Sequence, residues 1–378
     1  MAEDMGVQPA GDGATVLEEL NRHAAAHNIP LGAHIDLTYR CDLACVHCYL
    51  VDRIKPELSV AEIERVLDDL QSLGGLMVLF SGGDLFLRPD ALTILKAACD
   101  RRFFVQIITH ANHIDAAVAD ALEAMGIGEV KVSIYSSRPE VHDAITKVPG
   151  SLHASLKAIS LLRERGVEVE MKCPIMRGNE GAQLEIPILA AKYDSRFALD
   201  HTIRSAQGQG LDPLPPVGLS GGCVDLRALN ADVEVKIDLI SHIMPSLRGL
   251  ADLGNKSPSQ PVCTAGRSSV YVDPEGNVFP CLEWEEPAGN VRQSSFAQIW
   301  REGEVFGRAR GLKRSAFKGC VSCENFSFCD ICPGQAHRET GSATGVSPSK
   351  CRDSSVKRMA VERIAGAADS GGGCGCGG

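Results

Sequence analysis

Three closely spaced cysteines, Cys41, Cys45 and Cys48, constrain what this chain can fold into more than any other feature of its sequence. They follow a strand-like run at 34–38 with the spacing C-x3-C-x2-C, so one short loop can present three thiolates to a single metal centre. Structural zinc usually takes four protein ligands, and ordinary iron-sulfur clusters are held by four cysteines. Three ligands therefore indicate a metal centre that keeps one position open for a substrate or cofactor. The alternative is a zinc site that lacks one ligand.

Length and charge limit the remaining possibilities. The 378 residues exceed the roughly 100–200 of one domain, so we expect one large domain and one smaller one. The net charge of −10, with acids and bases interspersed, argues against nonspecific nucleic-acid binding and gives no basic face for a membrane. No apolar run approaches the ~20 residues of a membrane helix, and residues 1–15 lack the regions of a signal peptide. We expect a cytoplasmic protein, whose fifteen cysteines indicate metal binding rather than disulfides.

Strand and helix patterns alternate regularly up to about residue 204. Strands are expected at 33–39, 76–80, 103–108, 129–134, 167–172 and 197–204, and helices at 16–28, 58–73, 89–101, 114–125, 151–165 and 182–192. This alternation predicts a parallel sheet with right-handed crossovers, either doubly wound or a barrel. The cysteine loop and the polar or Gly-rich turns follow the strands. That placement favours a barrel, where chemistry is assembled from loops at the carboxyl ends of the strands.

These motifs resemble those of radical S-adenosylmethionine (radical SAM) enzymes, whose hallmark is C-x3-C-x2-C after the first strand of a partial barrel. The resemblance covers about residues 31–225 and implies a partial (β/α)6 TIM-like barrel in an α/β fold. It implies that Cys41, Cys45 and Cys48 hold a 4Fe-4S cluster whose free iron binds S-adenosylmethionine. An external electron donor such as flavodoxin or ferredoxin would drive reductive cleavage to a 5'-deoxyadenosyl radical, which abstracts hydrogen from the substrate.

The resemblance also assigns cofactor contacts. Gly82-Gly83-Asp84 lies where the family usually has Gly-Gly-Glu, so both glycines would let the backbone approach the cofactor and Asp84 would reach its amino group. It places the His47 backbone against the adenine. Ser133 and Lys172 would reach the ribose or carboxylate, with ordinary strand polarity as the alternative. Three residues near predicted strand ends are candidates for a catalytic acid or base, although each could equally be structural: Tyr135, Asp200 and His201.

A second group of cysteines follows a Gly- and Pro-rich stretch at 208–222 and an expected helix at 231–245. Residues 269–272 and 277–280 are expected to form two strands joined by a turn, which would bring Cys281 back toward Cys263. The group resembles the SPASM extension of radical SAM maturases, which carries two auxiliary iron-sulfur clusters, here expected to be 4Fe-4S. By that resemblance, one cluster is held by Cys320, Cys323, Cys329 and Cys351, and the other by Cys263, Cys281 and Cys332. The alternative is a zinc ribbon built from the two C-x2-C pairs.

The second auxiliary cluster is one cysteine short. Cys223 is the nearest candidate for its fourth ligand, and without it the cluster has an open iron or a noncysteine ligand. A helix at about 354–367 is expected to precede a disordered tail whose Cys374 and Cys376 could capture metal, exchange electrons or do little. We expect an N-terminal extension at 1–30, the barrel at 31–225, a helical linker at 226–260, the SPASM-like domain at 261–355 and the terminal helix and tail at 356–378.

The substrate follows from the SPASM resemblance, which implies a peptide or protein. The leading hypothesis is maturation of a ribosomally synthesised peptide by a thioether or carbon-carbon crosslink, or by oxidation. Residues 142–151 resemble a loop common in such maturases. About thirty residues precede the first strand, too few for a fused recognition domain, so a separate leader-peptide-binding protein or direct groove binding is expected. The alternatives are radical modification of a small molecule or tetrapyrrole, and a noncatalytic iron-sulfur carrier or scaffold.

Overall fold

Six parallel strands whose order follows the sequence form the main sheet. The computed structural model describes residues 16–50, 52–200, 234–236 and 257–370. The six strands are β1 (Gly32–Thr38), β2 (Met77–Gly82), β3 (Phe104–Thr109), β4 (Glu129–Ser133), β5 (Val169–Pro174) and β6 (Arg196–Asp200). They lie in the order β6-β5-β4-β3-β2-β1, and each neighbouring pair is parallel. A doubly wound sheet reverses its order at a switch point, so the unbroken order confirms the partial barrel over the doubly wound alternative.

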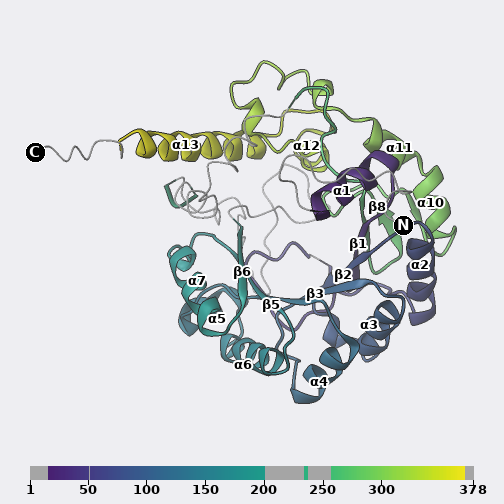
Figure 1. Cartoon of the computed structure of the whole chain (residues 1–378), viewed down its shortest axis with the longest axis vertical. Coiled ribbons are helices and arrows are strands. Elements are labelled where there is room, and N and C mark those ends of the chain that lie inside the picture. The colour runs from purple at the N-terminus through teal and green to yellow at the C-terminus, as the bar shows by residue number, and fades with distance from the viewer. Residues whose placement is uncertain (1–15, 51, 201–233, 237–256, 371–378) are drawn as a thin grey trace, which may run out of the picture.

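Helices connect successive strands and form an arc around the outside of the sheet (Figure 1). They are α2 (Val60–Ser72), α3 (Ala91–Asp100), α4 (Ala116–Met125), α5 (Pro139–Thr146), α6 (Ser151–Glu164) and α7 (Ala182–Lys192), and α1 (Val16–His27) precedes β1. Except for α5, each was expected, and its ends lie within about two residues of the expected ones. Residues 201–204 of the sixth expected strand lie outside the described part of the chain.

The start of α2 is fixed by a capping box. The Ser59 hydroxyl accepts from the Glu62 N–H at 3.3 Å, and the Glu62 carboxylate accepts from the Ser59 N–H at 2.8 Å. Two N–H groups that the first helical turn leaves without partners are thereby satisfied. A serine followed three residues later by a glutamate is the usual sequence pattern of this cap.

Helix α5 was not expected, because its buried face is partly polar. It has eight residues, and its buried positions are His142, Ile145 and Thr146. Pro139 at its first turn suits a helix start, since proline has no N–H to leave unpaired there. A short helix with two polar residues on its inner face gives too little apolar periodicity to be recognised.

The core lies between the strands and the surrounding helices. Val78, Val105, Val130 and Val169 project from four successive strands, and each is at most 1% exposed. Because side chains alternate across a strand, the residues between these positions face the inside of the barrel. The outward face is therefore apolar, and the inward face can carry polar groups for chemistry.

The C-terminal part of the chain adds three strands to the same sheet. β7 (Ser269–Val272) and β8 (Asn277–Phe279) form the expected antiparallel hairpin, which is confirmed, and β9 (Gly289–Asn290) follows. The parallel pairing of β7 with β1, with Ala33 opposite Val270, was not expected. One continuous sheet therefore joins the barrel to the cysteine-rich part, and the domain divisions given above stay predictions.

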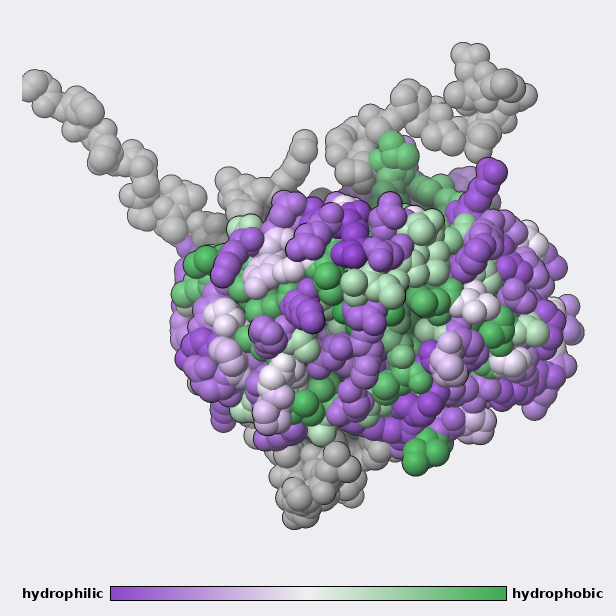
Figure 2. All heavy atoms as spheres, turned by 90° about the horizontal axis from the view of Figure 1, so that it is seen from below, coloured by the Kyte–Doolittle hydropathy of each residue, from purple (hydrophilic) through white to green (hydrophobic). Residues whose placement is uncertain are grey.

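The remaining α-helices of the described chain belong to its C-terminal part. They are α10 (Phe296–Glu302), α11 (Glu304–Gly311), α12 (Pro333–Thr340) and α13 (Pro348–Ser370), which begins earlier than the expected 354. Within the described ranges, no helix combines the length and apolar character needed to span a membrane. Hydrophilic and hydrophobic side chains are interspersed on the face shown in Figure 2. Most of the expected helix at 231–245, together with His201, Cys223, Cys374 and Cys376, lies outside the described residues.

Candidate active site at the barrel mouth

The cysteine loop lies at the carboxyl ends of the strands and is held by the end of α5. The loop has no helix or strand of its own. The Ala44 N–H donates to the Thr146 carbonyl and the Val46 N–H to the Ile145 carbonyl, each at 3.0 Å. These two bonds fix the middle of the loop against the neighbouring helix.

The three thiols of this loop lie close enough to influence one another. Burial is the main cause that raises the pKa of Cys41 to about 11 and that of Cys45 to about 12, and the neighbouring thiols, Cys48 among them, raise both further. Arg53 acts in the opposite direction on both. Three half-buried thiolates close together need a compensating positive charge, which a metal centre supplies. The donor set therefore fits a cluster held by three cysteines.

The last glycine of β2, Gly82, and the glycine that follows it, Gly83, permit a close approach between β2 and the start of the cysteine loop. A Cβ at Gly82 would collide with the Thr38 carbonyl oxygen, and one at Gly83 would collide with the Arg40 carbonyl oxygen. Gly82 also has φ of +127°, a conformation that side chains disfavour. The Gly83 N–H donates to the Thr38 carbonyl at 2.7 Å. The backbone packing alone requires both glycines, and their contact with a cofactor stays a prediction.

Asp84 is fully buried, and its carboxylate already has protein donors. One oxygen accepts from the Phe86 N–H at 3.0 Å. The other accepts from the Thr109 hydroxyl at 2.5 Å and from the His110 N–H at 3.2 Å. In this structure the side chain joins the ends of β2 and β3, and its contact with a cofactor amino group stays a prediction.

Five of the predicted site residues line one cavity at the mouth. The cavity has a volume of about 310 Å³ and lies beside the cysteine loop, at the ends of β3 to β6. Its lining includes His47, Ser133, Tyr135, Lys172 and Asp200, and it is completed by Ile108, Cys173, Pro174, Ala198 and Leu199. Cys173 is a lining residue that also belongs to the hydrophobic core, where burial raises the pKa of its thiol.

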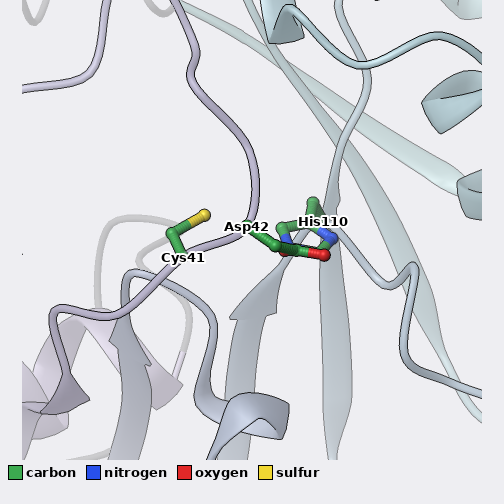
Figure 3. Close-up of side chains that lie close together, drawn as sticks. All are labelled: Cys41, Asp42 and His110. Carbon is green, nitrogen blue, oxygen red and sulfur yellow. The ribbon is translucent and has the colours of Figure 1, made fainter. Parts of the chain in front are cut away.

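Sequence reasoning missed a polar network beside Cys41. Figure 3 shows Asp42 next to His110, with Cys41 nearby. The His110 Nε2 lies 3.0 Å from Asp42 and 3.1 Å from Asp84, and the His113 Nε2 lies 2.9 Å from Asp42. Burial alone would raise the pKa of Asp42, but His110 and His113 lower it below its usual range. The signal in the sequence was the pair of histidines three residues apart after β3.

Cys41, Asp42 and His110 present ligand atoms within 4.8 Å of one another. Three donors at that separation could hold a metal ion by themselves. Cys41 is predicted to bind the cluster together with Cys45 and Cys48, so we do not assign a separate metal site here. The network instead links the start of the cysteine loop to the ends of β2 and β3.

Seven of the other described cysteines fall into two groups in space. Cys320, Cys323, Cys329 and Cys351 influence one another's charged forms, and Cys263, Cys281 and Cys332 do the same. Burial is the main cause of the raised pKa of Cys281, followed by Cys332 and Cys263. These are the two sets that the resemblance assigns to two clusters, and their ligand roles stay predictions.

A buried arginine lies beside the four-cysteine group. Arg314 is 2% exposed and donates to the Cys329 carbonyl at 3.0 Å. Its guanidinium packs over the Phe326 ring at 4.4 Å. Burial lowers the pKa of Arg314, and the thiols of Cys329 and Cys320 oppose this shift. A cation in this position stabilises negative charge on the surrounding sulfurs.

Comparison with known proteins decides the family. The sequence profile of the radical SAM superfamily matches residues 35–185, and that of SPASM, an iron-sulfur cluster-binding domain, matches residues 263–332. The chain contains a radical SAM domain and a SPASM domain. This radical SAM protein is therefore an enzyme, and its domains bind S-adenosylmethionine and iron-sulfur clusters.

Relatives of this radical SAM enzyme align over most of its length. It is 25% identical to AdoMet-dependent heme synthase from Methanosarcina barkeri, covering 84% of this chain and 95% of that protein. It is 27% identical to PqqA peptide cyclase from Granulibacter bethesdensis, covering 78% and 80%. The crystal structure of Streptococcus suis SuiB bound to precursor peptide SuiA superposes with a TM-score of 0.67 at 16% identity, covering 93% of this chain and 85% of that one. The last likeness supports the fold.

Proposed function

We propose that this enzyme cleaves S-adenosylmethionine reductively and abstracts hydrogen from a peptide, in the maturation of a ribosomally synthesised peptide. The observation that carries the proposal is the cavity beside Cys41, Cys45 and Cys48, with polar side chains at the ends of β3 to β6. When bound, the cluster and S-adenosylmethionine supply a 5'-deoxyadenosyl radical at this position. The three cysteines are proposed as the cluster ligands.

The cavity residues have complementary tasks in this proposal. Lys172 offers a positive charge to the cofactor carboxylate, and Ser133 offers a hydroxyl to the ribose. The apolar side chains of Ile108 and Leu199 exclude water from the wall. Exclusion of water protects a reactive intermediate from side reactions. Asp200 and Tyr135 line the same cavity.

We further propose two auxiliary 4Fe-4S clusters in the SPASM domain, one for each cysteine group. The three-cysteine group would keep one iron open or take a fourth ligand such as Cys223. These clusters could accept the electron left on the product radical or bind a substrate thiolate. The proposal includes a flavodoxin or ferredoxin as donor, a separate leader-peptide-binding protein as partner, and a location in the cytoplasm, where thiols stay reduced.

A peptide substrate is supported by the names of two proteins that this chain resembles. One is a cyclase of the PqqA peptide, and the other was crystallised with its precursor peptide SuiA. A second candidate is modification of a tetrapyrrole, which the heme synthase favours because the alignment covers 95% of that protein. Both candidates use the same cavity and cofactor.

Anaerobic reconstitution with iron and sulfide tests the core of the proposal. We expect about twelve irons per chain and reductant-dependent 5'-deoxyadenosine. Cys45→Ala should remove about four irons and all deoxyadenosine. Cys99→Ala is the matched control, because this cysteine lies on α3, away from the grouped thiols. This variant should keep its full iron content and its deoxyadenosine production. Bound zinc without deoxyadenosine would overturn the proposal.

The substrate class needs a separate experiment. The loaded enzyme is incubated with S-adenosylmethionine and reductant, together with either a library of cysteine-rich precursor peptides or a panel of iron tetrapyrroles. Mass loss or crosslinks in a peptide would support maturation. Turnover confined to a tetrapyrrole would replace the leading candidate with the second.

A further inference from the structure

Cys332 lies directly before α12 and takes the place of its capping residue. The helix runs from Pro333 to Thr340, and the backbone of Cys332 is extended. The Gln335 N–H donates a hydrogen bond to the Cys332 sulfur at 3.4 Å. In most capped helices a serine or aspartate oxygen accepts this bond, and here a sulfur accepts it. The sulfur of a predicted cluster ligand therefore lies at the positive end of a helix.

The first turn of α12 is fixed to the segment that follows Cys281, a predicted ligand of the same cysteine group. A Cβ at Gly334 would collide with the Glu283 carbonyl oxygen, so the two backbones lie against each other. The guanidinium of Arg338, which is 8% exposed, pairs with Glu283 at 3.2 Å and with Glu285 at 2.9 Å. The helix cannot turn away from the sulfur without breaking these contacts.

Other contacts of α12 hold the donor in place. Ala336 is 1% exposed and belongs to one hydrophobic cluster with Phe317 and Phe326. The side-chain amide of Gln335, which is 7% exposed, donates to the Ser349 hydroxyl at 2.6 Å. Because a backbone N–H does not ionise and this helix turn is packed on several sides, the bond to the sulfur has a fixed geometry.

We propose that the Gln335 N–H raises the reduction potential of the auxiliary cluster held by Cys263, Cys281 and Cys332. The inference rests on the proposed function, which makes these three cysteines cluster ligands. The reduced cluster carries one more negative charge than the oxidised one, so a donor to a ligand sulfur at the positive end of a helix stabilises it more. Gln335 is a positioning residue in this role, because it acts through the Cys332 sulfur and does not react.

Redox titration of the reconstituted holoenzyme, followed by electron paramagnetic resonance, tests the proposal without any substrate. Gln335→Pro removes the N–H, and proline is tolerated in the first turn of a helix. Gln335→Ala is the matched control, because it loses the same side-chain bond to Ser349 and keeps the N–H. At a fixed poise we expect the ratio of reduced to oxidised cluster to be about tenfold lower in the proline variant than in the alanine variant, a difference of about 59 mV for one electron. The other clusters should keep their potentials.

A second variant keeps the glutamine side chain. Placing the α-hydroxy acid of glutamine at position 335 exchanges the backbone N–H for an oxygen that cannot donate, so the potential of the same cluster should fall. This variant decides the outcome if the proline variant does not load its cluster. Equal potentials in the alanine variant and in a loaded variant that lacks the N–H would overturn the proposal.

Cys332→Ala separates failure of this inference from failure of the proposed function. The paramagnetic signal that disappears in this variant belongs to the cluster at α12. If no signal disappears, the ligand assignment in the proposed function is wrong and the inference fails with it. If the signal disappears but the potential does not depend on the N–H, the ligand assignment stands and only the inference fails.

Discussion

The backbone N–H of Val46 donates a hydrogen bond of 3.0 Å to the carbonyl oxygen of Ile145, which ties the cysteine loop to the last turn of α5. The loop lacks regular secondary structure, so the position of its three thiols depends on contacts of this kind. The turn from α5 to α6 is thus part of the metal centre's support, although it contributes no ligand to it.

Asp143 organises that turn, and its removal should loosen the loop. Its carboxylate accepts from the Gly150 N–H at 2.6 Å, the Ser151 hydroxyl at 2.9 Å and the Leu152 N–H at 3.1 Å. Asp143→Ala leaves these donors without their acceptor and should cost about 1–3 kcal/mol of unfolding free energy. We also expect faster iron loss to a chelator from the radical SAM cluster. Glu140→Ala, on the same helix, is the control, and equal rates of iron loss in both variants would contradict the expectation.

Gly83→Ala should prevent assembly of the cluster. The added Cβ would collide with the backbone oxygen of Arg40, which cannot move without shifting the cysteine loop. Iron content after reconstitution should fall by about one third, which is the share of one cluster among the three that we propose. Gly307→Ala in α11 is the control, because nothing lies within 4 Å of its added Cβ and the variant should be as stable or more so. Full iron loading of Gly83→Ala would show that the loop tolerates the shift.

Lys172→Met should weaken cofactor binding and leave the clusters in place. The methionine keeps most of the side-chain volume but loses the charge that we assign to the cofactor carboxylate. Loss of a charge-assisted hydrogen bond of about 1.5–3 kcal/mol corresponds to roughly a 10- to 150-fold weaker affinity. Equilibrium binding of S-adenosylmethionine to the reconstituted enzyme measures this, with Lys157→Met on α6 as the control. An unchanged affinity would mean that Lys172 is an ordinary polar residue of β5 and does not contact the cofactor.

His142 should make stability depend on pH below neutrality. Burial lowers its pKa to about 4, while the unfolded chain keeps the ordinary value of about 6.5. Between these values the unfolded state binds the proton and the folded state does not, so the unfolding free energy falls as pH falls, by up to ~1.4 kcal/mol per pH unit. Above the unfolded value this stability is fully present.

The variant His142→Asn isolates the effect. Asparagine can still accept from the Tyr135 N–H but does not titrate. Urea unfolding of both proteins between about pH 7 and pH 4.5 should show a smaller decline in the variant. Parallel declines would assign the pH dependence to other groups.

The helices and strands of the barrel could be predicted because each one carries its own pattern. Each of the four strands that carry these valines has one apolar face. The pair Ser59 and Glu62 marks the start of a helix within four residues. Contacts between distant residues have no such local signature. Asp84 is buried with its carboxylate bonded to Thr109, which lies 25 positions away. The sequence around Gly82 and Gly83 contains no pattern that indicates this partner. The pairing of Ala33 with Val270 is hidden for the same reason.

The family resemblance named Ser133 and Lys172, and the structure brings both into one cavity with Tyr135, while their roles stay predictions. The anchoring of the cysteine loop could not be foreseen, because it uses backbone carbonyls of Ile145 and Thr146, which any residue provides. The sequence shows which side chains are present, but it does not show which backbone groups will form hydrogen bonds with a distant loop.

The pairing of β7 with β1 has a consequence for how the protein is made. On the ribosome, β1 emerges more than two hundred residues before its partner β7, and until then one side of β1 is an unpaired edge. An open edge can pair with another chain, so the nascent barrel is exposed to aggregation during that interval. The strand that leads into the cysteine loop is also the one that waits longest for its neighbour. Slow synthesis or truncation before Val272 would therefore harm the metal centre at the other end of the sequence.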